Sequence, residues 1–522
     1  MITWQEKEDD MDRVRIWDRY EFRIGADVPV ANPFTEVAFS ARISWETGEV
    51  TVDGFYDGDG QYCFRFMPSS IGFHRFVTQA NVAELNALAG TFMVDKAAEG
   101  VHGPVRTAGT RFRYADGAPF FAMGTTAYAW HYRPAEVRSL TLSSFREYGF
   151  NKVRMLVFPK QYSDSQGKLD ISYEPPCYPF AGQPRLFDFK RPNPAYFRDL
   201  EQRVLDLMAI GVEADVILFH PYDSGHWGID SGMSEDDALL YLKYIVARLA
   251  SCRNVWWSLA NEYDIDNRAG FVIGTTRRHW DVIGAFVQAH DPFGHLISCH
   301  NIPFGVIYPD RPWLSHVSYQ HPDTYALMLE LMARYRKPVI NDEYQYEGNV
   351  PDDWGNSTAE LVVERHWKSL MAGGYATHGE AYIRDNNRDI FWSYGGQITG
   401  ESASRLRYLK EIALRCPLDD MTRDPVNTDG CHYFSLAKGT DFYLFFFRDD
   451  MPGKWLWPGP WDRTRAGVRY RATFHDVWNC RKIEEVELAA GARIQITAFT
   501  AVTLERMTNK SRQDKQAPDD LQ

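Results

Sequence analysis

Hydrophobic and polar positions alternate along the first hundred residues in the pattern typical of short β-strands. Residues 37–43, 48–54 and 62–67 show this period of two, and the turn sequence Asp57-Gly-Asp-Gly60 separates the last two segments. Such alternation places one side of each strand on a core, and closely spaced turns join the strands antiparallel. We therefore expect an N-terminal β-sandwich over residues 1–103.

From residue 104 to residue 420, apolar runs alternate with amphipathic segments. Eight runs have the length and apolarity of buried strands, and they begin near Phe120, Lys152, Val212, Asn254, His295, Leu314, Pro338 and Tyr375. Helix-like segments such as 193–210 and 236–250 lie between them. This order indicates an α/β fold, and eight such units predict a (β/α)8 TIM barrel.

Two further segments depart from the barrel pattern. Residues 160–192, after the second strand, are rich in Pro, Gly, Tyr and Asp and have no clear period. We expect them to form a long loop that shapes the active site or contacts a neighbour. Strand character returns over residues 421–508 and predicts a C-terminal β-sandwich, which a polar tail at 509–522 follows.

Charge and cysteine content narrow the class of protein. The chain of 522 residues has a formal net charge of −13 and no long basic run, which disfavours nucleic acid and anionic membranes as partners. The sequence contains no run of about 18 apolar residues, so it predicts no membrane span. The acidic N-terminus is unlike a signal peptide. Seven scattered cysteines without a C-x-x-C motif argue against a disulfide framework or a zinc site. We expect a cytoplasmic protein without a cofactor, and the sequence leaves homo-oligomer formation open.

Two glutamates each end an apolar run among the predicted strands. Glu262 closes Asn254-Val-Trp-Trp-Ser-Leu-Ala-Asn-Glu262, and Glu343 closes Lys337-Pro-Val-Ile-Asn-Asp-Glu343. Active sites of parallel barrels form where the strands end, and a pair of carboxyl groups there is the apparatus that cleaves a glycosidic bond. The alternative is that each acid only ends a strand or caps a helix.

The surroundings of the two acids suggest different roles. The preceding Val-Trp-Trp stretch would desolvate Glu262 and favour its protonated form, as an acid/base catalyst needs. Arg154 on the second strand would keep Glu343 ionised as a nucleophile. Asn261 can donate a hydrogen bond to a sugar hydroxyl. Asp342 and Glu347 are rival carboxylates, but neighbours on an extended strand point to opposite sides, so only one of Asp342 and Glu343 should face the interior.

Other strand-end residues are candidates for binding a carbohydrate substrate. We expect His220, Tyr222 and Trp227 to line the site after the third strand, and either Tyr319 or His321, after the sixth, to donate to Glu343. His378 and Glu380 would grip the substrate, and Trp392 would stack beneath a sugar ring. Each ring or histidine has core packing as its alternative. A metal site built from His220, Asp223, His226 and Glu262 is the remaining alternative, although the early His-x-His pair of such sites is missing.

Several motifs resemble those of the apiosidase-like barrel group, within the clan A retaining glycoside hydrolases. They are Gly124-Thr-Thr-Ala-Tyr-Ala-Trp130, His220-Pro-Tyr-Asp223, the Asn254 to Glu262 segment and Trp392-Ser-Tyr-Gly-Gly396. Asn32-Pro-Phe34 and Asp53-Gly-Phe-Tyr-Asp-Gly58 resemble a sandwich domain of uncharacterised function that often precedes such barrels. The resemblance implies Glu262 as the acid/base and Glu343 as the nucleophile, and it adds Trp130 to the substrate-binding candidates.

These observations predict a retaining glycoside hydrolase that acts from chain ends on short oligosaccharides or glycosides. The long loop and the two sandwiches would narrow the mouth of its barrel. The rival hypothesis from another class is a non-catalytic carbohydrate-binding protein on a TIM-barrel scaffold.

Overall fold

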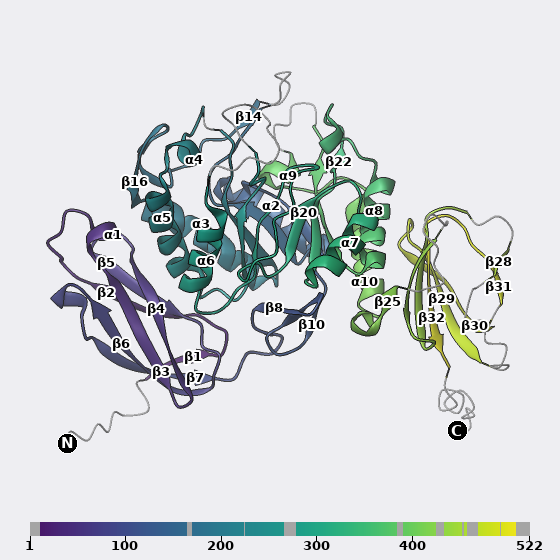
Figure 1. The fold of residues 1–522 in the computed structure, drawn as a ribbon, viewed down its shortest axis with the longest axis horizontal. Helices are drawn as coiled ribbons and strands as arrows, with labels where there is room; N and C mark the ends of the chain where they lie inside the picture. Colours follow the sequence, from purple (N-terminus) through teal and green to yellow (C-terminus); the bar gives the residue numbers. More distant parts are fainter. Residues whose placement is uncertain are drawn as a thin grey trace.

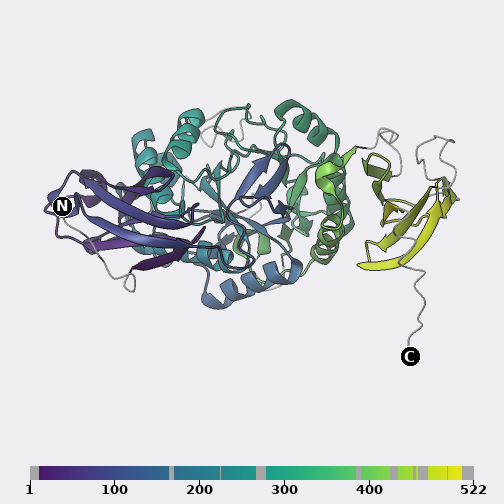
Figure 2. The ribbon, with the colours of Figure 1, turned by 90° about the horizontal axis from the view of Figure 1, so that it is seen from below.

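The computed structural model describes residues 11–163, 170–223, 225–265, 278–383, 390–423, 433–450, 454–456, 468–490 and 492–507. An N-terminal β unit, a central α/β barrel and a C-terminal β unit follow one another along the chain (Figure 1). The barrel lies between the two β units, as the view from below also shows (Figure 2).

Eight parallel strands form the central barrel. They are β11 Gly124–Thr126, β12 Lys152–Leu156, β17 Glu213–Phe219, β18 Val255–Ala260, β19 Ile297–Ser298, β20 Val317–Gln320, β21 Val339–Glu343 and β23 Tyr375–His378. They pair in the order β19-β18-β17-β12-β11-β23-β21-β20. Each predicted apolar run therefore contains a barrel strand, and the predicted TIM barrel is confirmed.

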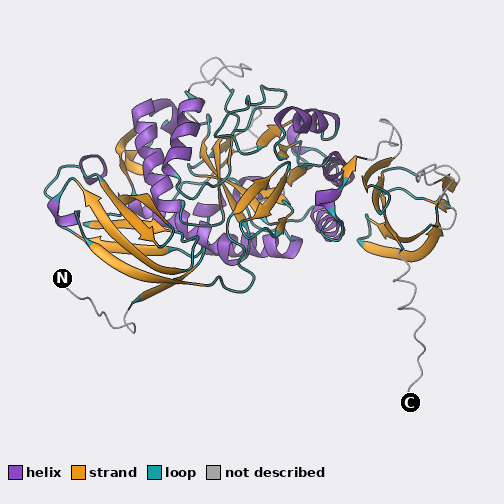
Figure 3. Cartoon of the chain, turned by 60° about the horizontal axis from the view of Figure 1, so that its bottom comes forward, coloured by secondary structure: helices purple, strands orange, loops and turns teal. Residues whose placement is uncertain are grey.

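Helices surround these strands (Figure 3). The longer ones are α2 Ala135–Tyr148, α3 Pro194–Ala209, α5 Glu235–Leu249, α6 Trp280–His290, α7 Ala326–Tyr335, α8 Ala359–Ala372 and α10 Ser402–Ala413. Local sequence sets several of their ends. Asn193 caps α3 by accepting from the amide of Ala195, and Ser234 and Asp237 form a capping box at α5. Among the described residues, no helix combines the length and apolarity that a membrane crossing requires.

The N-terminal unit is a seven-stranded sheet that folds over on itself. Its strands are β1 Asp12–Arg15, β2 Tyr20–Gly25, β3 Phe39–Trp45, β4 Gly48–Tyr56, β5 Gln61–Phe66, β6 Gly72–Ala80 and β7 Ala89–Asp95, in the order β1-β7-β6-β3-β4-β5-β2. Tyr20 at one end of this order stacks on Phe92 near the other, with ring centroids 3.9 Å apart. This contact closes a sandwich core and confirms the predicted β-sandwich.

A small antiparallel sheet covers the base of the barrel. It consists of β8 Val105–Ala108, β9 Arg111–Tyr114 and β10 Pro119–Phe120. Phe112 of β9 packs on Trp256 of β18, with ring centroids 5.0 Å apart. The amino ends of the strands are therefore closed, and the open end is the one at which the strands finish.

The C-terminal unit is also built from β-strands. Its main sheet runs in the order β25 Thr422–Arg423, β26 Tyr433–Lys438, β27 Phe442–Phe447, β32 Thr500–Arg506, β29 Arg469–Asp476 and β30 Arg481–Ala489. A second pair, β28 Lys454–Leu456 and β31 Arg493–Gln495, places Ile494 in the same apolar cluster as Phe445 and Tyr470. These two layers agree with the predicted sandwich, and the predicted tail at 509–522 lies outside the described residues.

Both β units attach to the outer helices of the barrel. Arg248 of α5 is fully buried and pairs with Asp57 of the N-terminal sheet. On the other side, Trp367 of α8 stacks on Phe446 of the C-terminal sheet, with ring centroids 4.8 Å apart. In Figure 1 the two units lie beside the barrel rather than over the end that carries β14 Asp170–Ser172 and β22 Glu347–Gly348. Neither unit covers that end, but the N-terminal unit reaches the insertion at its rim, because the side-chain amide of Asn32 donates to the carbonyl of Lys190 at 3.0 Å. That the sandwiches narrow the mouth stays a prediction.

The long insertion after β12 does lie at the open end. It forms two hairpins, β13 Gln161–Ser163 with β14 Asp170–Ser172 and β15 Phe180–Gln183 with β16 Leu186–Pro192. At the turn of the second hairpin, the amide of Arg185 donates to the carbonyl of Trp227, at 2.9 Å. The insertion thus packs on the segment that follows β17 and narrows the mouth from that side.

Candidate active site

The two predicted catalytic acids lie at the open end of the barrel. Glu343 is the last residue of β21, and Glu262 comes two residues after β18 ends. The backbone of Glu262 has a φ of +50°, in the left-handed region that residues with side chains rarely adopt. Such conformations cluster at functional sites, where the surrounding structure holds them in place.

Glu343 is buried among hydrogen-bond donors. Arg154 Nη1 lies 2.7 Å and His300 Nε2 lies 3.5 Å from Glu343 Oε1, and the hydroxyl of Tyr128 donates to the same oxygen. Burial alone would raise the pKa of Glu343. The hydrogen bond from His300 and the charge of Arg154 outweigh it and lower that pKa to about 2. Glu343 is therefore a carboxylate at neutral pH.

Glu262 has a different environment. The hydroxyl of Tyr222 donates to Oε2, and the side-chain amide nitrogen of Gln320, with the amide in its hydrogen-bonded orientation, lies 3.1 Å from Oε1. Burial and then the negative charge of Glu343 raise the pKa of Glu262 to about 8. Glu262 is therefore a neutral acid where Glu343 is ionised.

A chain of hydrogen bonds links the two acids. Arg154 holds Glu343 with one guanidinium nitrogen, and its Nη2 lies 2.5 Å from Asn261 Oδ1. Asn261 Nδ2 in turn donates to the Tyr222 hydroxyl at 2.8 Å, and that hydroxyl donates to Glu262. The structure thus brings Arg154, Asn261 and Tyr222 together between the acids; of the three, only Arg154 was expected to contact one of them.

A β-bulge changes the expected orientation of Asp342. In the pairing of β20 with β21, Tyr319 lies opposite Asn341 and Gln320 lies opposite Glu343, so Asp342 has no partner across the ladder. The extra residue lets two consecutive side chains point inward. The expectation that only one of Asp342 and Glu343 faces the interior is therefore wrong.

Asp342 belongs to a buried polar layer below the catalytic one. It pairs with Lys152 Nζ at 2.9 Å and accepts from the hydroxyls of Ser318 and Thr377, each at 2.6 Å. Lys152 also pairs with Asp215 at 2.6 Å. These partners occupy Asp342, so Glu343 is the carboxylate of β21 that is placed to meet a substrate.

Two predicted substrate-binding residues lie in the core instead. Trp130 is fully buried and packs edge-on against Phe145, at 6.1 Å between ring centroids. His378 is also fully buried, stacks on Phe150 at 5.0 Å and lies 2.9 Å from the hydroxyl of Thr125. The side chain of His378 therefore faces the helices outside the barrel. Neither residue is placed to touch a substrate.

Two other acids accept hydrogen bonds from the backbone of the segment between β24 Glu380–Ala381 and α10. Glu380 accepts from the amides of Thr399 and Gly400, at 3.0 Å and 2.6 Å. Glu347 accepts from the amide of Glu401, at 2.7 Å, just before α10 begins. Backbone donors satisfy both carboxylates. Glu380 thus does not grip a substrate as expected, and Glu347 is not a rival nucleophile.

Neither Tyr319 nor His321 donates to the carboxylate of Glu343. The hydroxyl of Tyr319 donates to the carbonyl of Asp323 at 3.3 Å. The amide of His321 donates to the main-chain carbonyl of Glu343 at 3.1 Å. His321 therefore fixes the backbone of the nucleophile strand and leaves its acid to other donors.

Trp227 supports the insertion rather than the acids. Its side chain is almost fully buried, with its ring 6.1 Å from that of Tyr178. It thus fills the space beneath the second hairpin of the insertion.

His220 supports the residue that contacts Glu262. Its ring stacks on Tyr222 at 5.4 Å between centroids, and its Nε2 lies 3.2 Å from the carbonyl of Pro159. Burial lowers the pKa of His220 to about 4, so the ring is neutral near neutral pH. We conclude that His220 positions Tyr222.

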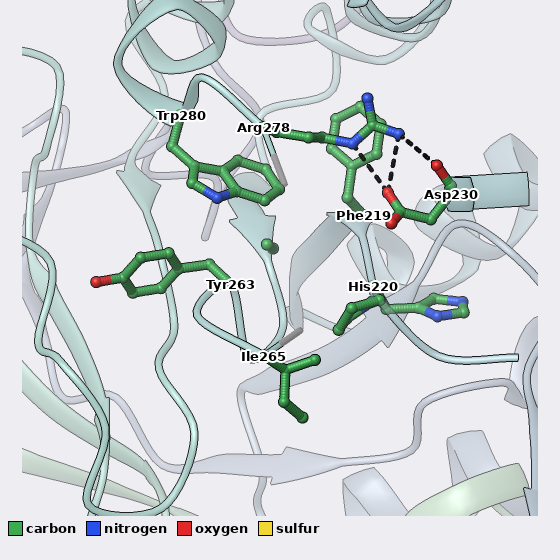
Figure 4. Close-up of a pocket in the computed structure, with 9 residues that line it drawn as sticks. Phe219, His220, Asp230, Tyr263, Ile265, Arg278 and Trp280 are labelled. Atoms are coloured by element: carbon green, nitrogen blue, oxygen red, sulfur yellow. Dashed lines mark hydrogen bonds and ion pairs between the residues drawn. The ribbon is translucent and has the colours of Figure 1, made fainter. Parts of the chain in front are cut away.

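A small cavity lies behind this part of the site (Figure 4). Its volume of about 10 Å³ leaves room for about one water molecule. Arg278 lies over the ring of Phe219 at 4.7 Å and pairs with Asp230 at 2.8 Å at its edge. The cavity is lined by Phe219, His220, Pro221, Asp230, Ala260, Tyr263, Ile265, Arg278 and Trp280. It is too small for a sugar.

Trp392 lies where a sugar-stacking ring was expected. It is part of α9 Phe391–Tyr394, is half-buried and packs edge-on against Tyr128, at 6.0 Å. Trp354 lies against its other side at 4.7 Å. Because Tyr128 contacts Glu343, this pair of indoles borders the nucleophile side of the mouth.

Sequence reasoning missed three residues that contact the acids: Tyr128, His300 and Gln320. Tyr128 lies within a quoted motif, but its hydroxyl reaches Glu343 from the end of β11, which β23 separates from β21. His300 follows β19 by two residues, so its strand-end position was the available signal. Gln320 ends β20 opposite Glu343 and carries no charge that would draw attention to it.

The residues considered as metal ligands do not converge. Asp223 pairs with Lys160 at 3.2 Å, and His226 pairs with Glu174 at 3.1 Å. Over the part of the chain that the structure describes, no group of three His, Cys, Asp or Glu residues is placed to hold a metal ion.

Comparison with known proteins identifies the family of the barrel. Residues 106–418 match the family model described as Apiosidase-like, catalytic domain, and residues 13–81 match a domain of unknown function, DUF5060. The crystal structure of a presumed glycoside hydrolase from Bacteroides vulgatus ATCC 8482 shares 35% identity with a TM-score of 0.85, over 95% of this chain and 100% of that chain. No match was found among curated proteins.

A more distant structure shares the fold. It is a glycoside hydrolase family 5 protein, also from Bacteroides vulgatus ATCC 8482, with 18% identity and a TM-score of 0.60, over 77% of this chain and 94% of that chain. The family match covers more than half of the present chain and contains both acids. The chain belongs to the apiosidase-like family of glycoside hydrolases, with residues 106–418 as its catalytic domain.

Proposed function

We propose that this protein hydrolyses glycosidic bonds with net retention of anomeric configuration, with Glu262 as acid/base and Glu343 as nucleophile. The observation that carries the proposal is the opposite shift of two neighbouring carboxyl groups, to a pKa of about 8 for Glu262 and about 2 for Glu343. A retaining enzyme needs one protonated and one ionised carboxyl group at the start of its reaction.

The first step forms a covalent intermediate. The Glu343 carboxylate attacks the anomeric carbon and forms an ester while the bond to the leaving oxygen breaks. Glu262 gives its proton to that oxygen, so the leaving group departs as an alcohol. The ester removes the negative charge of Glu343, and the pKa of Glu262 falls because that charge had helped to raise it.

The second step returns the enzyme to its starting state. Ionised Glu262 accepts a proton from a water molecule, whose oxygen attacks the anomeric carbon and releases Glu343 as a carboxylate. Arg154, Tyr128 and His300 stabilise that carboxylate as it leaves. Two displacements at one carbon give net retention.

We further propose that the enzyme acts from chain ends on short oligosaccharides or glycosides. The two hairpins of the insertion pack over the segment that follows β17 and support a restricted mouth. Efficient random cleavage of a long polysaccharide would contradict this preference.

A panel of aryl glycosides tests the activity, with the anomer of the first product followed by NMR. The comparison uses wild type, Glu343→Gln and the exposed control Glu330→Gln on α7. We expect wild type to hydrolyse its substrate with net retention of anomeric configuration. Glu330→Gln should match wild type, and Glu343→Gln should lose turnover. Net inversion would refute the nucleophile role. Equal inertness of wild type and Glu343→Gln on every sugar that binds would favour a carbohydrate-binding protein.

A further inference from the structure

The loop of residues 300–306, between β19 and β20, is tied to the acid/base segment. Asp264, two residues after Glu262, accepts from the amides of Ile302 and Val306, each at 2.8 Å. Both carboxylate oxygens are therefore used to fix the shape of this loop. The position of its tip relative to Glu262 is set by direct hydrogen bonds.

The tip of the loop presents an aromatic ring to solvent. Phe304 is 65% exposed, and Val306 beside it is 50% exposed. The backbone of Phe304 has a φ of +57°, a conformation that is unfavourable for a phenylalanine. Because the ring is exposed, its burial does not offset the free-energy cost of this backbone conformation. Strained residues that their surroundings hold in place are found where a ligand is bound.

Phe304 and its loop contact residues that lie next to the two catalytic acids. Its ring packs edge-on against His321 at 4.8 Å, and the amide of His321 donates to the carbonyl of Glu343. From the same loop, Asn301 accepts from the amide of Gln320, whose side chain reaches Glu262. The ring therefore borders the mouth on the side of Glu262 and β20.

The opposite border of the mouth already has an aromatic surface. Trp392 packs against Tyr128, which holds Glu343, so a sugar bonded to the nucleophile lies on that side. Glu262 must give its proton to the oxygen of the leaving group. The leaving group therefore lies beside Glu262, on the side where Phe304 is exposed.

We propose that Phe304 is a stacking platform for the leaving group, and that the leaving group is itself a saccharide. Phenyl rings pack against the apolar C–H faces of sugars, and Val306 extends the apolar surface. This inference rests on the proposed function, because it takes the proton donor to be Glu262.

The test compares two leaving groups on the same glycosyl residue, which is the one that wild type turns over fastest in the aryl glycoside panel. The first substrate is a disaccharide of that sugar, and the second is its glycosyl fluoride, which has no leaving-group ring. We expect Phe304→Ala to lower kcat/KM on the disaccharide by roughly tenfold and to leave the fluoride unchanged. Phe304→Trp should restore turnover of the disaccharide. The control is Phe73→Ala, on the N-terminal sheet, where the native ring is 51% exposed.

Equal loss on both substrates, or no loss on the disaccharide, would overturn the assignment of Phe304 while leaving the proposed function intact. A binding measurement covers the case in which wild type is inactive. Saturation-transfer NMR of Glu343→Gln with a disaccharide panel should show contacts from the reducing-end sugar that disappear when Phe304→Ala is added. Persistence of those contacts would overturn the assignment, whereas inactivity alone would contradict the proposed hydrolysis.

Discussion

Asp342 and Glu343 are consecutive in the chain, yet both carboxylates point into the barrel because a β-bulge removes Asp342 from the pairing of β20 with β21. The two acids meet different cations from one face of β12, where Lys152 pairs with Asp342 and Arg154 pairs with Glu343. The barrel interior thus has a closed polar layer below and a reactive layer above.

The pH dependence of kcat/KM should show two limbs. Glu343 has a lowered pKa of about 2, so the nucleophile is present above that pH and is lost as pH falls through it. Glu262 has a raised pKa of about 8, so the proton donor is present below that pH and is lost as pH rises through it. Initial rates across this range should form a bell with a broad plateau. A rate that keeps rising above pH 8 would contradict the role of Glu262.

Glu262→Gln should damage turnover in proportion to how much the leaving group needs a proton. We expect kcat/KM to fall by about 10²–10⁴-fold on a substrate with a poor alkoxide leaving group. The loss should be much smaller on a dinitrophenyl glycoside of the same sugar, because dinitrophenolate leaves without protonation. The alkaline limb should disappear with the latter substrate. An equal loss on both substrates would indicate that Glu262 does not act as the acid.

Tyr128→Phe should weaken the nucleophile without removing it. The variant loses the hydroxyl that donates to Glu343, and the pKa of Glu343 should rise because that hydrogen bond helps to lower it. The acid limb of the pH profile should therefore move upward, with a decrease in kcat of about tenfold for the lost bond. Tyr132→Phe is the control, because its hydroxyl lies 3.5 Å from the carbonyl of Lys160. An unchanged acid limb in Tyr128→Phe would contradict this role.

Asp342→Asn should destabilise the barrel more than it changes the chemistry. It removes one of two carboxylates that neutralise buried Lys152, and breaking a buried pair costs about 3–5 kcal/mol. Asp215 remains beside Lys152, so we expect the lower end of that range. The melting temperature of Asp342→Asn would be compared with that of Asp419→Asn. The latter breaks an exposed ion pair with Arg113, which contributes up to about 1 kcal/mol to the free energy of unfolding. Equal melting temperatures for the two variants would refute the structural role of Asp342.

The sequence was sufficient to predict the architecture because burial leaves a strong pattern. Barrel strands such as β17 and β18 are covered on both faces and read as largely apolar runs, although β17 also contains Glu213 and Asp215. The sandwich strands alternate instead. The two acids were also found from position, since each ends such a run.

Side-chain direction was the main source of error. His378 ends the eighth strand as expected, but its side chain faces the outer helices. Glu380 lies beyond that strand, in β24, and accepts from backbone amides. The inward turn of Asp342 depends on a bulge set by pairing with β20, which no local pattern reveals. Residues that contact the acids from other strands, such as His300, require the closed barrel to be recognised.

The most direct test of the account is the identity of the residue that forms the covalent intermediate. Wild type would be incubated with 2-deoxy-2-fluoroglycosyl fluorides, whose intermediates hydrolyse slowly, and its peptides examined by mass spectrometry. We expect a single glycosyl label, on Glu343. A label on Asp342 or Glu262 would contradict it, as would turnover with net inversion and no label.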